Sequence, residues 1–383
     1  MARRFDYVLV GVGLQNALVT LALAARRPGS RVLLVERAEA PLGNHTWCFH
    51  AGDVPEAARD FVEPALASSW PRYRVRFPGY TRTLEESYVS VTVPSLKAAL
   101  ERACERLHAS MLLGRSAVEV GAHHVLLDDG TRIEATVVID ARGPTATVPH
   151  TLGFQKFVGL ELRLSEPRSF DPVIMDATVE QIDGFRFMYV LPFAPDRVLV
   201  EDTYYSRSPE LDVAKVTARV LAHAAQLGLG ISTIERREQG VLPLPGKVAL
   251  PNVQASGPLC AGYAGGLFHP VTGYSFPLAV RFAQRLATLA PEEARGGAHA
   301  AFMSQVRGQA RYLAWLNGLL FHGMADDERR NVLERFYTLP EPTIRRFYAM
   351  TLTPVDKARI VCGRPPRGFS LSSILAKHQT RPA

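Results

Sequence analysis

The chain has 383 residues, of which 47% are hydrophobic and 21% charged, and its formal net charge is +7. At roughly 150 residues per domain this length predicts two or three domains with a substantial core, and the ordinary composition excludes disordered, collagen-like and coiled-coil proteins. No apolar stretch reaches the ~20 residues that a membrane-spanning helix needs, and the first residues lack the pattern of a signal peptide. Four scattered cysteines without a C-x-x-C pair, and eleven histidines without ligand spacing, indicate reduced thiols in the cytoplasm and predict no disulfide framework and no metal site.

The N-terminal residues are expected to form a strand, a helix and a second strand. Residues 5–10 are a β-type run, residues 17–27 are helical, and the glycine turn Gly11-Val12-Gly13 lies between them. Residues 31–35 form a second buried strand that ends at Glu36. A βαβ unit with an acidic residue at this point is typical of dinucleotide-binding domains.

Each part of this unit has a physical task. Gly11 permits the tight turn and Gly13 lets the backbone approach a pyrophosphate, which the N-terminus of the following helix attracts through its free N–H groups. Leu14 in this turn is a further expected cofactor contact. Glu36 accepts hydrogen bonds from a ribose. The third glycine of the G-x-G-x-x-G motif is replaced by Asn16, so the close packing of helix on strand must be relaxed there. The alternative is that these glycines are accidental.

Two later strands end in a similar way. One apolar run stops at Asp140 and Gly143, and another leads into a turn with Gly262, Gly265 and Gly266. We expect these residues to contact the same cofactor. Strand-rich sequence lies between the two turns and helical sequence follows them, so the cofactor-binding elements are discontinuous, an arrangement that suits a flavoprotein.

The predicted fold class is therefore α/β, with a discontinuous FAD-binding Rossmann domain, an inserted β-sheet substrate domain and a helical C-terminal region. The predicted boundaries are residues 1–50, 88–150 and 240–295 for the FAD-binding domain, 51–87 and 151–239 for the substrate domain, and 296–383 for the helical region.

Three blocks are the most specific part of the sequence: V-I-M-D-A-T from Val173, L-V-E-D-T-Y-Y from Leu199 and G-L-F-H-P-V-T-G-Y from Gly266. In these blocks the chain resembles the bacterial lycopene β-cyclases, which are FAD-dependent carotenoid cyclases with a glutathione-reductase-like flavoprotein fold. The resemblance runs nearly end to end. Further matching blocks are residues 6–16, 44–50, 155–161, 184–193 and 335–357.

The resemblance implies an isomerase that closes a β-ionone ring at each ψ-end of lycopene, giving γ-carotene and then β-carotene. It also implies FAD in its reduced form, NADPH as the reductant and no net redox change. The family's essential acid falls on Glu201. The insoluble carotenoid substrate implies a cytoplasmic protein that lies peripherally on the inner face of the cell membrane, with other carotenoid-pathway enzymes as candidate partners.

Ring closure begins with protonation of an alkene. The site must therefore hold an acid that is still protonated near neutral pH, exclude water and tolerate a cation. Glu201 ends an apolar run, and burial would raise the pKa of its carboxyl group. Asp202 should face the other side of the same strand; periodicity alone leaves the choice of catalytic acid open between them, and the resemblance favours Glu201. The alternative is that both acids bridge neighbouring strands.

Aromatic residues near the matched blocks are expected to line an apolar tunnel and to stabilise a cation. The predicted substrate contacts are Phe185, Tyr189, Tyr204, Phe268, His269 and Tyr274. For any single ring, a place in the core is the alternative. His269 is a candidate base for the last deprotonation, although a hydrogen-bonding role within its loop is favoured.

The positive charge is concentrated near the C-terminus. From Pro340 onward there are eight Lys and Arg residues against two acids. No aromatic platform or binding motif accompanies them, so we expect no nucleic-acid partner. Residues 312–321 and this basic tail together favour contact with an anionic membrane surface; a buried packing helix and a solvated tail are the alternatives.

Two other functions fit the same sequence. A FAD-dependent monooxygenase or prenyl reductase of the same fold would consume NADPH in proportion to its product. A non-catalytic prenyl-binding chaperone would need the apolar cleft and no flavin.

Overall fold

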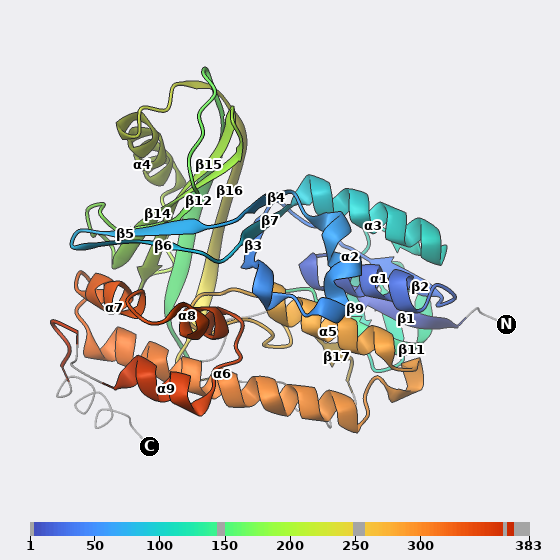
Figure 1. Cartoon of the computed structure of the whole chain (residues 1–383). Helices are drawn as coiled ribbons and strands as arrows, with labels where there is room; N and C mark the ends of the chain where they lie inside the picture. Colours follow the sequence, from blue (N-terminus) through green and yellow to red (C-terminus); the bar gives the residue numbers. More distant parts are fainter. Residues whose placement is uncertain (1–3, 144–149, 248–256, 363–365, 371–383) are drawn as a thin grey trace.

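The computed structural model describes residues 4–143, 150–247, 257–362 and 366–370 (Figure 1). Within these residues the chain forms a parallel sheet covered by helices, a second large sheet that is mainly antiparallel, a small third sheet and a group of C-terminal helices. The α/β fold class expected from the sequence is confirmed.

The parallel sheet is assembled from distant parts of the chain. Its strands lie in the order β8 (Ser110–Leu112), β2 (Val32–Val35), β1 (Phe5–Val10), β11 (Arg132–Asp140) and β17 (Leu259–Cys260). Two further strands, β10 (His124–Leu127) and β9 (Ala117–Val120), continue from the beginning of β11 in antiparallel pairing. β2 and the last four residues of β1 and of β11 are all buried, as is typical of parallel strands covered on both faces.

Three helices pack together on one face of this sheet. They are α1 (Leu14–Arg26), α3 (Val93–Leu107) and α5 (Phe276–Thr288), and α1 contacts both of the others. Every residue of α1 from Leu14 to Ala24 is buried. Because α1 follows β1 directly and α5 follows the second glycine turn, this packing brings the two turns to the same edge of the sheet.

A small antiparallel sheet connects the two larger ones. Its strands lie in the order β3 (Thr46–His50), β7 (Tyr88–Thr92) and β4 (Ser68–Trp70). Between β3 and β4 the chain makes three short 3₁₀ turns and the single helical turn α2, which are Ala51–Asp53, Glu56–Ala58, Arg59–Val62 and Glu63–Ala65.

The second large sheet carries long antiparallel strands. Its order is β16 (Ile231–Pro245), β12 (Thr151–Leu164), β15 (Arg197–Ser206), β14 (Phe185–Ala194), β13 (Val173–Asp176), β5 (Tyr73–Phe77) and β6 (Tyr80–Leu84). Only β13 and β5 pair in parallel among the strands of this sheet. Helix α4 (Val213–Gln226) covers one face, where Figure 1 shows it on the outer side of the sheet. The opposite face is free to border a cavity.

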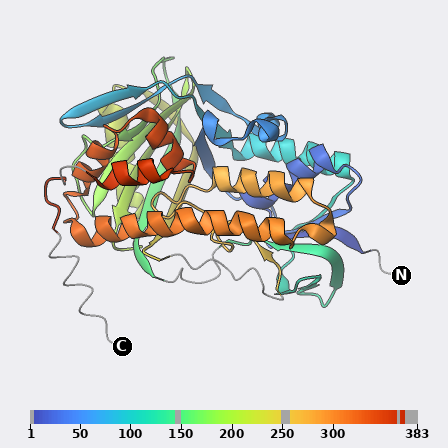
Figure 2. The same cartoon turned by 60° about the horizontal axis from the view of Figure 1, so that its bottom comes forward.

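The C-terminal helices lie along one side of both large sheets. They are α6 (Gly297–Gly323), α7 (Arg329–Phe336), α8 (Glu341–Tyr348) and α9 (Pro354–Val361), preceded by a 3₁₀ turn at Pro291–Glu293. Figure 1 shows the long helix α6 running along the bottom of the molecule, and Figure 2, with that side turned forward, shows it crossing the front. Asn317 of α6 is fully buried and donates hydrogen bonds to the carbonyl oxygens of Pro245 (3.0 Å) and Pro270 (2.6 Å), which fixes the helix against β16 and the second glycine turn.

Residues 312–321 form the second half of α6 and are mostly buried. Leu313, Ala314, Asn317, Leu320 and Phe321 pack into the core, whereas Trp315 is 48% exposed. In the part of the chain that the structure covers, no helix combines the length and apolar character required to traverse a bilayer. Of the basic residues counted near the C-terminus, Arg364, Lys377 and Arg381 lie outside the described residues.

Candidate active site

A cavity of about 920 Å³ lies between the parallel sheet and the free face of the second large sheet. One end is lined by the glycine turn after β1, by the residues that follow β2, and by parts of the turns after β11 and β17. The other end is lined by side chains of β3, β14, β15 and β16. The predicted nucleotide groove and Glu201 therefore share one cavity.

The first glycine turn is shaped by a close contact between two backbones. Gly11 has φ +85°, and a Cβ there would lie 2.8 Å from the carbonyl oxygen of Ala141. Gly13 is the N-cap of α1, and a Cβ at this position would meet nothing within 4 Å. The first N–H groups of α1 therefore adjoin open space beside the cavity, and no acidic residue occupies the first helical turn. This arrangement fits the phosphates of a dinucleotide.

Asn16 stabilises this turn through hydrogen bonds to its backbone. The side chain is completely buried, and its Nδ2 donates hydrogen bonds to the carbonyl oxygens of Val10 (3.1 Å) and Gly11 (2.8 Å). Asn16 does not line the cavity. Where the usual glycine would allow close packing, the asparagine ties the helix to the strand through hydrogen bonds.

Glu36 lies beside the turn at the end of β2. Its Oε2 accepts a hydrogen bond from the Val12 backbone N–H (2.7 Å) and its Oε1 accepts one from the Ala38 N–H (3.0 Å). The carboxylate is therefore held at the cavity wall, where a ribose hydroxyl could reach it.

The remaining predicted cofactor residues fall into two groups. Leu14, Gly143 and Gly262 line the cavity. Asp140 does not, since its carboxylate pairs with the Arg142 guanidinium (2.8 Å). Gly265 and Gly266 also lie outside the lining; a Cβ on Gly265 would lie 2.3 Å from the Cys260 carbonyl oxygen, so this glycine is required by the turn itself.

Glu201 belongs to a row of residues that crosses four strands. The register places Tyr189 of β14 opposite Glu201 of β15, and Gly159 of β12 between Glu201 and Glu238 of β16. Tyr189, Glu201 and Glu238 all line the cavity. A Cβ on Gly159 would lie 3.2 Å from Glu238 Oε1 and 3.3 Å from Glu201 Oε2. The two carboxyl groups thus approach each other over a residue without a side chain.

The carboxyl group of Glu201 is suited to hold a proton. Burial, followed by the negative charge of Glu238, raises its pKa from 4.5 to about 8. Its Oε1 accepts a hydrogen bond from the Thr203 hydroxyl (2.6 Å), which acts in the opposite direction. At neutral pH Glu201 is therefore mainly a neutral acid at the wall of the cavity.

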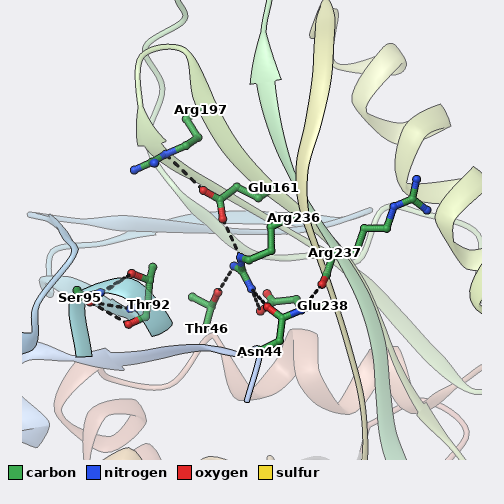
Figure 3. Close-up of polar contacts among 9 residues, drawn as sticks. All are labelled: Asn44, Thr46, Thr92, Ser95, Glu161, Arg197, Arg236, Arg237 and Glu238. Carbon is green, nitrogen blue, oxygen red and sulfur yellow. Dashed lines mark hydrogen bonds and ion pairs between the residues drawn. The ribbon is translucent and has the colours of Figure 1, made fainter. Parts of the chain in front are cut away.

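Glu238, in contrast, is bound to the Arg236 guanidinium. The Arg236 Nη1 donates to Glu238 Oε2 (2.8 Å), its Nε donates to Glu161 Oε2 (2.9 Å) and its Nη2 donates to the Thr46 hydroxyl (2.7 Å) (Figure 3). Figure 3 also shows Asn44 at this guanidinium, with its own amide bound to the Arg237 carbonyl oxygen (2.6 Å). The network joins β16 to the chain before and within β3, and it fixes a cation next to Glu238.

Asp202 faces the other side of the sheet, as strand alternation predicts. It is fully buried, and its two oxygens accept hydrogen bonds from Arg186 Nε (2.8 Å) and Nη2 (2.9 Å). The Tyr204 hydroxyl donates to the same carboxylate (2.7 Å). Neither Asp202 nor Tyr204 lines the cavity; both lie under α4.

Of the six predicted substrate contacts, two line the cavity, namely Tyr189 and Tyr274. Phe185, Tyr204, Phe268 and His269 do not. Phe185 is buried against Phe187 and Tyr205, and Phe268 stacks on Tyr263 with ring centroids 4.3 Å apart. Both rings therefore support the wall from behind.

His269 is a structural residue of its loop. It is fully buried, its Nε2 lies 3.0 Å from the Phe347 carbonyl oxygen, and its Nδ1 accepts a hydrogen bond from the Val271 N–H. Burial lowers the pKa of the imidazole to about 3. Both nitrogens are therefore engaged, in agreement with the hydrogen-bonding interpretation.

Several residues at the cavity were not expected from the sequence. The most important is Glu238 of the cavity wall, together with Gly159, which lies beside both carboxyl groups. Glu238 ends the charged run Glu235-Arg236-Arg237-Glu238, which looks like a solvated strand, and Gly159 is an isolated strand glycine. Such a glycine signals the close approach of other groups, although it does not say which ones. Further aromatic lining comes from Trp47, Tyr88, Tyr205 and Tyr348.

Two solved structures illustrate the similarity of fold. A geranylgeranyl bacteriochlorophyll reductase-like protein from Thermoplasma acidophilum has a TM-score of 0.65 at 13% identity, covering 99% of each chain. PqsL of Pseudomonas aeruginosa, described as a probable FAD-dependent monooxygenase, has a TM-score of 0.61 at 17% identity, covering 86% of this chain and 98% of PqsL. At these identities the likeness concerns the fold alone.

Sequence relatives identify the family. A lycopene beta-cyclase of Pantoea ananas is 39% identical over 385 residues, covering 99% of this chain and 100% of that protein. The family model of the lycopene cyclase protein matches residues 6–374. The chain therefore belongs to the lycopene cyclase family.

Proposed function

We propose that the protein is a lycopene β-cyclase that closes the ψ-ends of lycopene without net oxidation or reduction, with Glu201 as the proton donor. The observation that carries the proposal is a half-buried glutamic acid with a pKa raised to about 8, in the same cavity as a dinucleotide-type glycine turn. The near full-length identity to a lycopene beta-cyclase supports the substrate class.

In this proposal Glu201 gives its proton to the terminal alkene of the polyene. A tertiary cation forms, an internal double bond attacks it to close the six-membered ring, and a proton leaves the ring to create the new double bond. One proton enters and one leaves, so the product is an isomer of the substrate. Tyr189 lies opposite Glu201 in the strand register, and Tyr205 lies four residues further along β15. Both line the cavity, where aromatic faces stabilise a cation.

The residues at the other end of the cavity fit FAD. The open N-terminus of α1 at Gly13 would hold its phosphates, and Glu36 would hold a ribose. Reduced FAD, renewed by NADPH, would supply a negative charge near the reacting end of the polyene, and in a medium of low dielectric such a charge outweighs the quadrupole of any one ring.

Expression in a lycopene-accumulating bacterium tests the proposal. We expect the wild type to convert red lycopene to β-carotene, and Glu201→Gln to lose at least about 10³-fold of this activity because glutamine cannot donate a proton. Flavin absorbance of both purified proteins is the control for folding. Consumption of NADPH in proportion to product would instead identify a reductase or monooxygenase, and a purified wild type without flavin or cyclised product would overturn the proposal.

We also propose that the face formed by α6 and α9 contacts the membrane that supplies the carotenoid. Trp315 on α6 and Val355 and Val361 on α9 are exposed by 48%, 63% and 40%. The two helices meet where the Lys357 ammonium lies over the Tyr312 ring, 5.3 Å from its centroid. Aromatic, aliphatic and basic groups together favour an anionic bilayer surface. Flotation with vesicles of anionic lipid should fall several-fold for Trp315→Glu; flotation equal to that of the wild type would refute this contact.

A further inference from the structure

The cavity holds a second carboxylate whose position mirrors that of Glu201. Glu238 of β16 and Glu201 of β15 both pair with Gly159 of β12, the strand that lies between β15 and β16. The point where a Cβ on Gly159 would stand is 3.2 Å from Glu238 Oε1 and 3.3 Å from Glu201 Oε2. A side chain at residue 159 would separate the carboxyl groups, so its absence leaves them facing each other.

The two carboxyl groups have different partners. Glu238 is 4% exposed and accepts a hydrogen bond from Arg236 Nη1 (2.8 Å). Glu201 receives a hydrogen bond from the neutral hydroxyl of Thr203 (2.6 Å). A carboxylate next to a guanidinium favours its charged form, whereas a buried one without a cation favours its neutral form. Glu238 is therefore the member of the pair that is bound to a cation, and Glu201 is the member whose partner is a neutral hydroxyl.

Other titratable groups near the pair do not alter this assignment. Burial raises the pKa of the Cys48 thiol on β3 and lowers the pKa of the His45 imidazole, so both are neutral near pH 7. The Tyr189 hydroxyl on β14 also has its pKa raised by burial. Asp202 lies behind the sheet, neutralised by Arg186.

We propose, on the basis of the cyclase function above, that Glu238 is the catalytic base that removes the ring proton. Glu201 donates its proton to the alkene carbon and becomes a carboxylate. The ring-closed cation then loses a proton to Glu238, whose carboxylate becomes the acid, and the C–H electron pair forms the ring double bond. The proton count balances within the pair, and no oxidant or reductant takes part.

The proximity of the two groups couples the two proton transfers. Once Glu201 has donated its proton, two facing carboxylates would both be charged, which is unfavourable at short distance. This repulsion makes Glu238 a stronger base at the moment when the cation needs one. The proton on Glu238 can afterwards return to Glu201 across the gap above Gly159, so the pair is reset for the second end of the substrate.

A pH–rate profile of Glu238→Gln tests the inference. We expect kcat to fall by about 10²- to 10⁴-fold, the range for loss of a general base, with flavin content and KM near those of the wild type. The alkaline limb of the residual activity should move to lower pH, because removing the negative neighbour lowers the pKa of Glu201. Glu238→Asp should restore part of the rate.

Two further variants separate a base from a residue that only anchors Arg236. Glu161→Gln removes another acceptor of the same guanidinium, outside the cavity lining, so a merely structural role predicts equal losses in Glu161→Gln and Glu238→Gln. Gly159→Ala keeps every charge and places a methyl group between the two carboxyl groups; we expect at least a tenfold loss of kcat and the same direction of pH shift.

Wild-type activity keeps the two proposals distinct. If the wild type cyclises lycopene while Glu238→Gln stays within threefold of its kcat, or loses no more than Glu161→Gln, the inference about Glu238 is wrong and the cyclase function stands. If the wild type forms no cyclised product, the cyclase function itself fails.

Discussion

Two neighbouring acids of the second large sheet point to opposite faces and have different partners. Glu201 and Asp202 are adjacent on β15, and alternation sends one to the cavity and the other beneath α4. Asp202 receives two hydrogen bonds from Arg186 and one from Tyr204. Glu201 receives one from a neutral hydroxyl and faces another acid.

This difference shows that the partners of a buried acid, as much as its burial, decide its protonation. Asp202 is the more buried of the two, and both of its carboxylate oxygens accept hydrogen bonds from the Arg186 guanidinium. Glu201 has no hydrogen bond from a cation, and burial, followed by the negative charge of Glu238, raises the pKa of its carboxyl group to about 8. A single strand thus carries an ion-paired acid on one face and an acid of raised pKa on the other.

The largest effect is expected from breaking the buried ion pair between Asp202 and Arg186. Asp202→Asn keeps the shape of the side chain and leaves the Arg186 guanidinium buried without a counter-charge. Breaking a buried ion pair in this way costs about 3–5 kcal/mol. Urea unfolding followed by circular dichroism at pH 7 should show this loss of unfolding free energy, while the folded fraction of the variant should still bind flavin.

Asp60→Asn is a matched control for that variant. Asp60 makes the same kind of two-pronged pair, with Arg26, but its side chain is 54% exposed. Exposed pairs contribute about 0–1 kcal/mol. Equal losses in Asp202→Asn and Asp60→Asn would mean that the two faces of the sheet do not differ as described.

Features that depend on neighbouring residues could be predicted from the sequence. The glycine turn, α1 and Glu36 lie within one βαβ unit, and the structure brings them together at the cavity. The opposite directions of Glu201 and Asp202 follow from the period of a strand. The discontinuous α/β fold also followed, because each glycine turn comes directly after an apolar run.

Features that depend on the register of distant strands could not be predicted. Glu238 meets Glu201 only because β15 and β16 pair with the same residue of β12. Tyr204 lies near the matched acids in sequence, yet it is two residues from Asp202 on β15 and therefore points to the same face of the sheet as Asp202. Phe185 points to the cavity face of the sheet, as Tyr189 does, but its ring is buried against Phe187 and Tyr205. Proximity in sequence therefore identified the right segment without selecting the right side chains.

A smaller effect, of opposite sign, is expected on the cavity side. Glu201 keeps its proton in the folded protein up to about pH 8, whereas an unfolded glutamate loses it above pH 4.5. Between these values the unfolded chain binds fewer protons than the folded one, so the wild type loses stability as the pH rises.

Glu201→Gln has no carboxyl group to ionise at this position, so its stability does not fall in this way as the pH rises. The variant should therefore exceed the wild type in unfolding free energy by about 2 kcal/mol at pH 9, after discounting for water in the cavity, and by much less at pH 5. Urea titrations of both proteins at the two pH values measure this difference. A variant that is no more stable than the wild type at pH 9 would show that the folded protein does not raise the pKa of Glu201, and Asp202→Asn, run alongside, should lose stability at both pH values.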